Sequence, residues 1–122
     1  MTLSHQITAI AASLLIAAPV FAGDSDHFKG EPAKTLEQAV ANFSEYNNKL
    51  EQLLTGDLTP DAMSEVHQLT YTLENALQKL DDEIDELEET LEKVHKASER
   101  ADTNTVRFAG EQYLTTSRNI VK

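Results

Sequence analysis

The chain has 122 residues and a formal net charge of −11, from 10 basic and 21 acidic side chains. Such an acidic surface repels nucleic acid and anionic lipid, which excludes nucleic-acid binding and electrostatic membrane docking as main functions. The sequence contains no cysteine, which excludes disulfides, thiolate metal sites, covalently attached haem, a thiol nucleophile and a cysteine-linked lipid anchor and leaves packing or a bound partner as the source of stability.

Residues 1–22 have the pattern of a secretory signal peptide. An uncharged apolar run from Ile7 to Ala22 is followed by an abruptly polar stretch, and Val20 and Ala22 put compact residues where a signal peptidase reads, which predicts cleavage after Ala22. The run is shorter than the roughly 20 residues that cross a bilayer. Retention as an anchor is the alternative, because no Lys or Arg precedes Ile7. We therefore expect a periplasmic or secreted protein with no membrane contact after cleavage.

Residues 23–34 mix Gly, Pro and charged side chains without apolar periodicity, and this composition predicts a flexible leader. The remaining residues, 35–122, are predicted to form a single helical domain, a size that can bury a core but gains from oligomerisation. Its first helix is predicted over 35–55. Thr35 is a suitable N-cap, and Gln38, three residues on, can complete a capping box.

The apolar residues of this first helix recur at helical spacing and define one face. Asn47 interrupts that face, and an asparagine in such a seam usually fixes the register of packed helices at a cost in stability. A ligand-binding role for Asn47 is the alternative. The apolar face comprises Leu36, Ala39, Val40, Phe43, Tyr46, Leu50, Leu53 and Leu54.

A second helix is predicted over 60–101, with Thr59 as its N-cap and a proline at its first position. Leu58 and Met63 stand where a hydrophobic staple needs them. Met63 could otherwise be nominated as a haem or copper ligand, because His67 follows four residues later. Packing explains Met63 without a metal.

This second helix is predicted to be long and unbroken, because neither Gly nor Pro occurs between residues 61 and 101. A stutter around Leu77 reduces supercoiling locally without breaking the helix. At about 1.5 Å per residue the helix would run roughly 60 Å. Its apolar seam comprises Val66, Leu69, Leu73, Leu77, Leu80, Ile84, Leu87, Leu91, Val94, Ser98 and Ala101.

A last helix is predicted over 103–121, capped by Asp102 or Thr103. Gly110 interrupts it, either as a point of close packing or as a modest weakness in the helix. We find no strand pattern and no internal repeat. The inward positions of this helix are Val106, Ala109, Tyr113, Ser117 and Ile120.

The stretch from Asp81 to Glu92 holds eight carboxylates in twelve residues, and all of them avoid the apolar seam. On a helix they point outward over more than half of the circumference. A calcium-binding loop needs alternating oxygen ligands and a glycine at its sharp turn, and this stretch has neither. We interpret it as a solvated acidic face, with weak and non-selective divalent-cation binding as the alternative.

His67, Glu92 and His95 are the candidate metal ligands. Glu92 and His95 form a Glu-x-x-His pair, the spacing that di-iron bundles use, although those sites need two such pairs and two further inward Glu residues. His67 and His95 are equidistant from Asp81. A chain that folded back at Asp81, or an antiparallel second copy centred there, would bring the two imidazoles to similar heights. The competing interpretation is that both are ordinary polar groups of a helix surface.

The segment ETLEKVHKASERADTNTVRFAGEQYLTTSRNIVK resembles the last hairpin of the cytochrome b562 family, and LEQAVANFSEYNNKLEQ is a fainter likeness to its first helix. The resemblance implies a periplasmic four-helix bundle that holds haem between a Met and a His. Those ligands align with Val40 and Lys122, and neither can bind haem iron. The loop between that family's middle helices is also missing. The chain is similar, too, to small exported helical proteins of Gram-negative bacteria without an assigned function.

The expected fold is therefore all-α: antiparallel helical hairpins around a long central helix, resembling a four-helix bundle. Two short helices cover only one side of the long one, so an antiparallel homodimer would supply the missing layer. In the competing model the chain bends near residues 80–83 and closes a monomeric four-helix bundle, although no Gly, Pro or Asn favours a break there.

No catalytic motif and no phosphate-binding loop occurs, so we expect neither an enzyme nor a bound cofactor. The leading functional hypothesis is a non-catalytic exported helical bundle that binds a protein partner or associates with itself. A haem-binding carrier of the b-type cytochrome kind, using unexpected ligands, is the first alternative. A weak acidic metal binder is the second.

Overall fold

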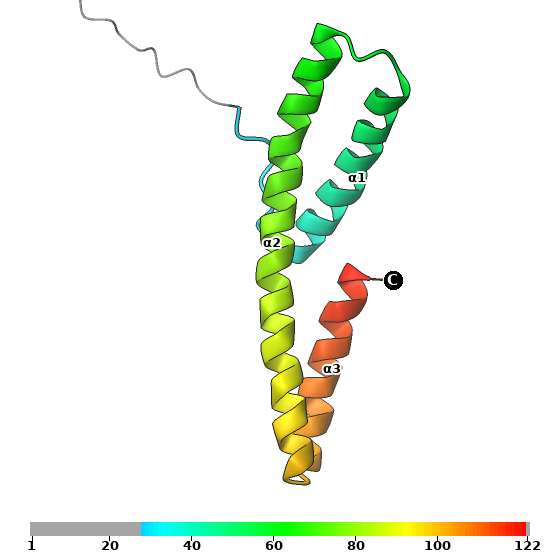
Figure 1. Ribbon diagram of the computed structural model, residues 1–122. Coiled ribbons are helices and arrows are strands. Elements are labelled where there is room, and N and C mark those ends of the chain that lie inside the picture. The colour runs from blue at the N-terminus through cyan, green and yellow to red at the C-terminus, as the bar shows by residue number, and fades with distance from the viewer. Residues whose placement is uncertain (1–27, 122) are drawn as a thin grey trace, which may run out of the picture.

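The computed structural model describes residues 28–121, which form three helices and no strand. They are α1 (Leu36–Thr55), α2 (Pro60–Glu99) and α3 (Thr103–Ile120). The chain turns back between α1 and α2 and again between α2 and α3, so α1 lies along one half of α2 and α3 along the other (Figure 1). The all-α class is confirmed. The predicted signal peptide, residues 1–22, lies outside the described residues.

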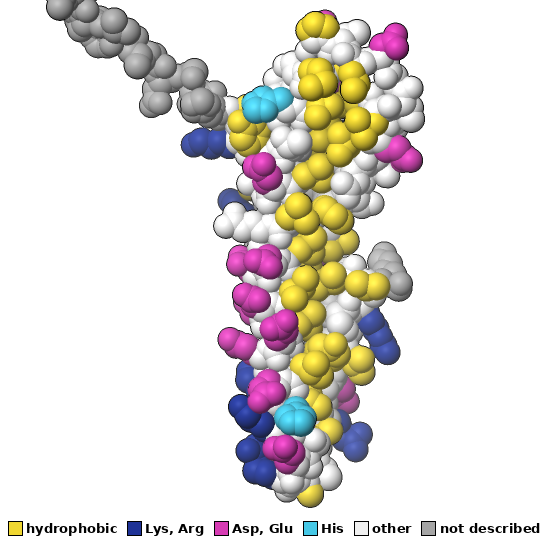
Figure 2. Space-filling view, in the orientation of Figure 1, with side chains coloured by type: hydrophobic (Ala, Val, Ile, Leu, Met, Phe, Trp, Pro, Cys, Tyr) yellow, Lys and Arg dark blue, Asp and Glu magenta, His cyan; other side chains and the backbone are white. Residues whose placement is uncertain are grey.

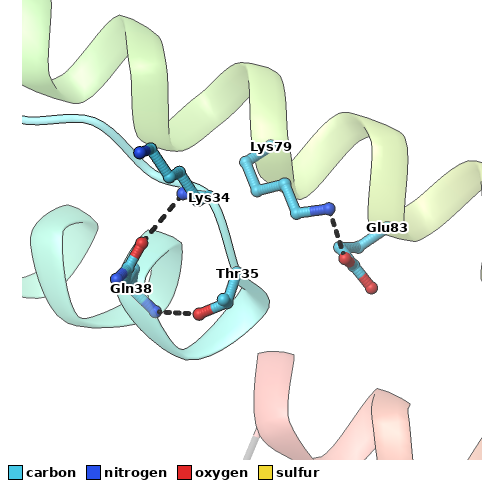
Figure 3. A network of polar contacts seen from close by, with 5 residues as sticks. All are labelled: Lys34, Thr35, Gln38, Lys79 and Glu83. Atoms are coloured by element: carbon cyan, nitrogen blue, oxygen red, sulfur yellow. Dashed lines mark hydrogen bonds and ion pairs between the residues drawn. The ribbon is translucent and has the colours of Figure 1, made fainter.

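Each helix begins at a side chain that accepts a hydrogen bond from the backbone N–H three residues on. For α1, Thr35 Oγ1 accepts from the N–H of Gln38 at 3.2 Å, and Gln38 Oε1 accepts from the N–H of Lys34 at 2.9 Å (Figure 3). Thr59 caps α2 at 3.2 Å, and Asp102 caps α3 at 3.1 Å. The three N-caps proposed from the sequence are therefore in place.

The central helix α2 is continuous over its 40 residues, including 80–83, where the competing model placed a bend. Its end differs slightly from the expected one. α2 ends at Glu99, because Ala101 adopts a φ of 54° and the N–H of Asp102 turns back to donate to the carbonyl of Ala97 at 2.9 Å. A positive φ cannot continue a right-handed helix. Ala101 therefore belongs to the turn and is exposed, rather than closing the apolar seam.

The core is small and rich in alanine. Four of its seven buried apolar residues are alanines, which let helix backbones approach closely but contribute little apolar surface. Thr72 is fully buried beside them. Because this core is small, many apolar side chains of the three helices remain partly exposed. The buried apolar residues are Leu36, Ala39, Leu69, Leu73, Ala76, Ala97 and Ala109.

Residues 28–34 differ from the flexible leader expected over 23–34, because they lie extended against α2; we call them the strap. The N–H of Glu31 donates to Thr72 Oγ1 at 2.9 Å, and Asn75 Nδ2 donates to the carbonyls of Lys29 and Glu31 at 2.9 and 3.0 Å. Gly30 makes this approach possible: its φ is +70°, and a Cβ there would lie 2.6 Å from the backbone nitrogen of Thr72.

Candidate interaction face

Most residues of the apolar seam of α2 fall into two parallel rows, each repeating every seven residues. The inner row faces the flanking helices and is buried or half-buried. The outer row is largely uncovered: Leu77, Ile84 and Leu91 are 51%, 44% and 47% exposed. A spacing of seven keeps side chains close to one line along a helix. The inner row is Val66, Leu73, Leu80, Leu87 and Val94; the outer row is Met63, Thr70, Leu77, Ile84, Leu91 and Ser98.

The strap and the outer row occupy opposite sides of α2. Asn75, which holds the strap, is two residues from both Leu73 and Leu77, and two residues correspond to about 160° around a helix. The strap therefore lies against the back of α2 around Thr72 and Asn75 and leaves the outer row free. Within residues 28–121, the large side chains of that row therefore stay about half exposed.

The first helix extends the uncovered surface. Tyr46 and Leu53 line a cleft with Phe28 of the strap, so this side of α1 faces the back of the molecule. Leu54 lies on the other side of the α1 apolar face, in line with Val40, and is 59% exposed. α1 thus adds a second apolar edge on the side of the outer row.

The third helix does the same for the other half of α2. Ser98 of the outer row lines a shallow hollow together with Val106 and Arg107 of α3, which places Arg107 on the side of the outer row. Leu114 follows Arg107 by seven residues, stands in line with it, and is also exposed. Figure 2 shows the result: a continuous hydrophobic band runs along the whole length of the described molecule. We call this surface the open face; it consists of the outer row of α2, the edge of α1 that carries Leu54 and the edge of α3 that carries Leu114.

Acidic side chains border the open face along one edge (Figure 2). On this edge, the α2 residues that lie next to the outer row also repeat every seven positions. Two of them, Glu88 and His95, share a shallow hollow with Leu91. This row, which we call the acidic rim, begins and ends with a histidine. Its members are His67, Glu74, Asp81, Glu88 and His95, and all five are exposed.

The candidate metal ligands do not converge. Glu92 pairs with Lys96 at 3.0 Å, and His95 Nε2 lies 3.4 Å from Glu99 rather than beside Glu92. The hydrogen bond and charge of Lys96 lower the pKa of Glu92. His67 and His95 are separated by 28 residues of one straight helix, which corresponds to about 42 Å. Within residues 28–121 no group of three or more His, Asp or Glu side chains is placed to hold a metal ion.

His67 contacts an aromatic residue rather than another candidate metal ligand. Its Nε2 lies 3.3 Å from the hydroxyl of Tyr71, whose ring meets that of Phe28 edge-on with centroids 6.3 Å apart. Through Phe28, the strap therefore packs against the pair that His67 and Tyr71 form one turn apart on α2. Phe28 was not singled out from the sequence, because a lone aromatic in a polar segment gives no periodic signal.

A cleft of about 410 Å³ opens between α1 and α2 at the back of the molecule, beside Phe28 and Leu69. Lys49 Nζ lies 4.1 Å above the ring centre of Tyr46, which also lines this cleft, and is paired with Glu45 at 2.7 Å. That hydrogen bond to Glu45 raises the pKa of Lys49. The cation is thus already engaged, and Glu65 is the other charged residue that lines the cleft.

These features define a three-helix protein with an uncovered apolar face and, within residues 28–121, no cluster placed to hold a metal ion. The chain belongs to a family of unknown function, DUF6746, whose model matches residues 1–122. No curated protein and no solved structure matches the chain significantly. Within residues 28–121, no helix is both long enough and apolar enough to cross a membrane.

The likeness to cytochrome b562 remains a resemblance. Val40, which aligns with that family's haem-binding Met, is half-buried on α1, and Lys122 lies outside the described residues. The family's loop between its middle helices corresponds to uninterrupted α2.

Proposed function

We propose that this protein is an exported, non-catalytic interaction module that binds another protein surface through the open face. One observation carries the proposal. Leu77, Ile84 and Leu91 form a half-exposed apolar row on the side of α2 that is turned away from the strap. Large contiguous apolar patches on soluble proteins commonly mark protein-binding surfaces. Export follows from the signal-peptide pattern of residues 1–22.

The energetics favour a covered open face. Full burial of a Leu or Ile side chain is worth about 1.5–3 kcal/mol, so covering these three half-exposed residues gains about 3 kcal/mol from the outer row alone. The alanine-rich core supplies little to offset such exposure. A partner that lays two helices on this face would complete a four-helix cross-section, the arrangement in which such apolar stripes are normally buried.

Site-specific photocross-linking tests the proposal. A photoreactive amino acid at Ile84, on the open face, is compared with the same residue at Asp82, which lies on the far side of α2, in the cells that produce the protein. Protein adducts are expected from position 84 and not from position 82. The absence of adducts at 84, or equal adducts at both positions, would overturn the assignment of the open face.

The export part of the proposal has its own test. Intact-mass analysis of protein recovered from the producing cells is expected to show a chain that begins at Gly23. A chain that retains residues 1–22 in the mature protein would contradict cleavage after Ala22.

A further inference from the structure

When two α2 helices pack antiparallel, the inner row of one helix can pack against the outer row of the other. A two-fold axis at the height of residue 82, perpendicular to the two helices, brings residue n of one copy opposite residue 164 − n of the other. Every inner-row residue then meets an outer-row residue. This match follows from the seven-residue repeat that the two rows share, and an axis near the middle of α2 extends it along almost the whole helix. The central pairs are Leu80 with Ile84, Leu77 with Leu87, and Leu73 with Leu91 of a second copy.

We propose that the occupant of the open face is a second copy of this chain, laid antiparallel so that the two α2 helices pack against each other. The inference rests on the proposed function and names the partner of the same face. The axis at Asp82 lies within three residues of the midpoint of α2 (Pro60–Glu99), so the two helices overlap over almost their whole length. Each copy then covers the open face of the other with a second layer of helices.

The flanking helices fit the same symmetry. α1 has 20 residues and lies on one half of α2, while α3 has 18 and lies on the other half (Figure 1). The two-fold rotation places α1 of one copy over α3 of the second. Both halves of the dimer acquire four helices in cross-section, with the Leu54 edge of α1 facing the Leu114 edge of α3 of the second copy.

Charges on this side are complementary. Glu51 is one turn from Leu54 on the edge of α1, and Arg107 is in line with Leu114 on the edge of α3. Both side chains are exposed, and neither forms an ion pair within residues 28–121. Fifteen residues separate Glu51 from Leu36, and thirteen separate Arg107 from Ile120. The two therefore lie at similar distances of about 20 Å from the centre, and the rotation brings Glu51 opposite Arg107 of the second copy.

The opposite side carries like charges. The acidic rim of one copy meets that of the second, two residues off the register of the apolar rows. Asp81 then lies beside its own counterpart and Glu74 beside Glu88, each pair offset by about 3 Å along the helices. This repulsion opposes the apolar gain and makes the dimer reversible rather than permanent.

The area buried in such a dimer is sufficient for a stable interface. A face about 60 Å long and about 18 Å wide covers roughly 1,000 Å² per copy, above the ~800 Å² per partner of standard stable interfaces.

Charge reversal tests the arrangement. Molar mass of the purified protein is measured by analytical ultracentrifugation over a concentration series, for the natural sequence, Glu51→Arg, Arg107→Glu and the double variant. Each dimer contains two Glu51–Arg107 pairs, so each single reversal is expected to raise the dimer dissociation constant about tenfold. The double variant should recover most of the loss. Within one chain these residues are about 40 Å apart, so recovery can come only from contact between copies.

Cross-linking of cysteine variants fixes the direction of the helices, because the natural chain has no cysteine. His67→Cys and His95→Cys proteins are treated with a short bis-maleimide, separately and mixed. The antiparallel arrangement predicts cross-linked dimers in the mixture and few in either protein alone. A parallel dimer would give the reverse.

Several outcomes would overturn the second copy as partner. They are a monomer at every concentration up to about 1 mM, no recovery in the double variant, or cross-links in the separate proteins alone. If Ile84 nevertheless cross-links to a different protein, the open face stands as an interaction surface and only the identity of its partner is wrong. If neither position 84 nor the purified protein associates with anything, the proposed function itself fails.

Discussion

Gly30 shows how one residue can hold a segment that has no apolar pattern. Its positive φ and its contact with the backbone of Thr72 leave no room for a side chain. We expect Gly30→Ala to destabilise the fold by about 1–3 kcal/mol and to release the strap, measured by urea denaturation and by amide exchange at residues 29–31. Gly110→Ala is the matched control. Nothing lies within 4 Å of the added methyl group in α3, so this change should stabilise by about 0.5–1 kcal/mol.

Asp102 gives the fold a defined response to acid. Hydrogen bonds from the side chain and backbone of Thr105 lower its pKa in the folded state. A carboxyl whose pKa is lowered by folding contributes stability above its unfolded pKa and loses that contribution as pH falls through the folded value. Asp102→Asn keeps a capping side chain but removes the charge.

We therefore expect Asp102→Asn to be less stable than the natural protein at pH 7. The difference should shrink as pH falls below about 4, the unfolded pKa, toward the lower folded pKa. Urea denaturation at pH 7, 5, 4 and 3 measures it. Glu37→Gln, at an exposed site in the first turn of α1, serves as a control for the loss of one carboxylate. A difference that grows toward low pH would contradict the role given to Asp102.

At the scale of the helices, alanine determines how closely α3 approaches α2. Ala97 is completely buried on the half of α2 that α3 covers (Figure 1). A larger side chain there must push the helices apart or adopt a strained rotamer, so Ala97→Leu is expected to cost about 1–3 kcal/mol. Thermal denaturation measures the loss. Ala41→Leu, at an exposed position of α1, should be close to neutral.

The sequence predicts the helices because their signals are local. Thr35, Thr59 and Asp102 mark the starts, and the absence of Gly and Pro between residues 61 and 99 is sufficient to keep α2 whole. The end of α2 lies two residues before the predicted one. Ala101 has a residue type that favours helix, and only the turn that leads into α3 gives it a positive φ.

The strap could not be predicted from the same signals. Asn75 and Lys29 are 46 residues apart in sequence, and their hydrogen bond involves a backbone carbonyl that any residue would offer. The open face was predictable only in part. Inner and outer rows of α2 show the same apolar spacing, and only the placement of α1 and α3 decides that Leu73 is buried while Leu77 is exposed.

For the whole molecule, the proposed assembly concentrates negative charge at its axis. Asp81 would lie beside Asp81 of the second copy, so one substitution removes the repulsion from both sides. We expect Asp81→Asn to tighten self-association about threefold to tenfold at low salt, with a smaller effect at 0.5 M salt because screening already weakens the repulsion. Asp82→Asn, on the far side of α2, should change little. Equal effects of both variants, measured by analytical ultracentrifugation, would indicate a general charge effect instead.

The strap also determines how the molecule can be handled. Because Lys29 and Glu31 are fastened to Asn75 at the rear of α2, the polypeptide enters the rod near its middle and on the side turned away from Ile84. A fluorophore or fused domain joined ahead of Phe28 would therefore emerge behind the rod. Immobilisation through that end should leave the contact surface accessible for binding measurements.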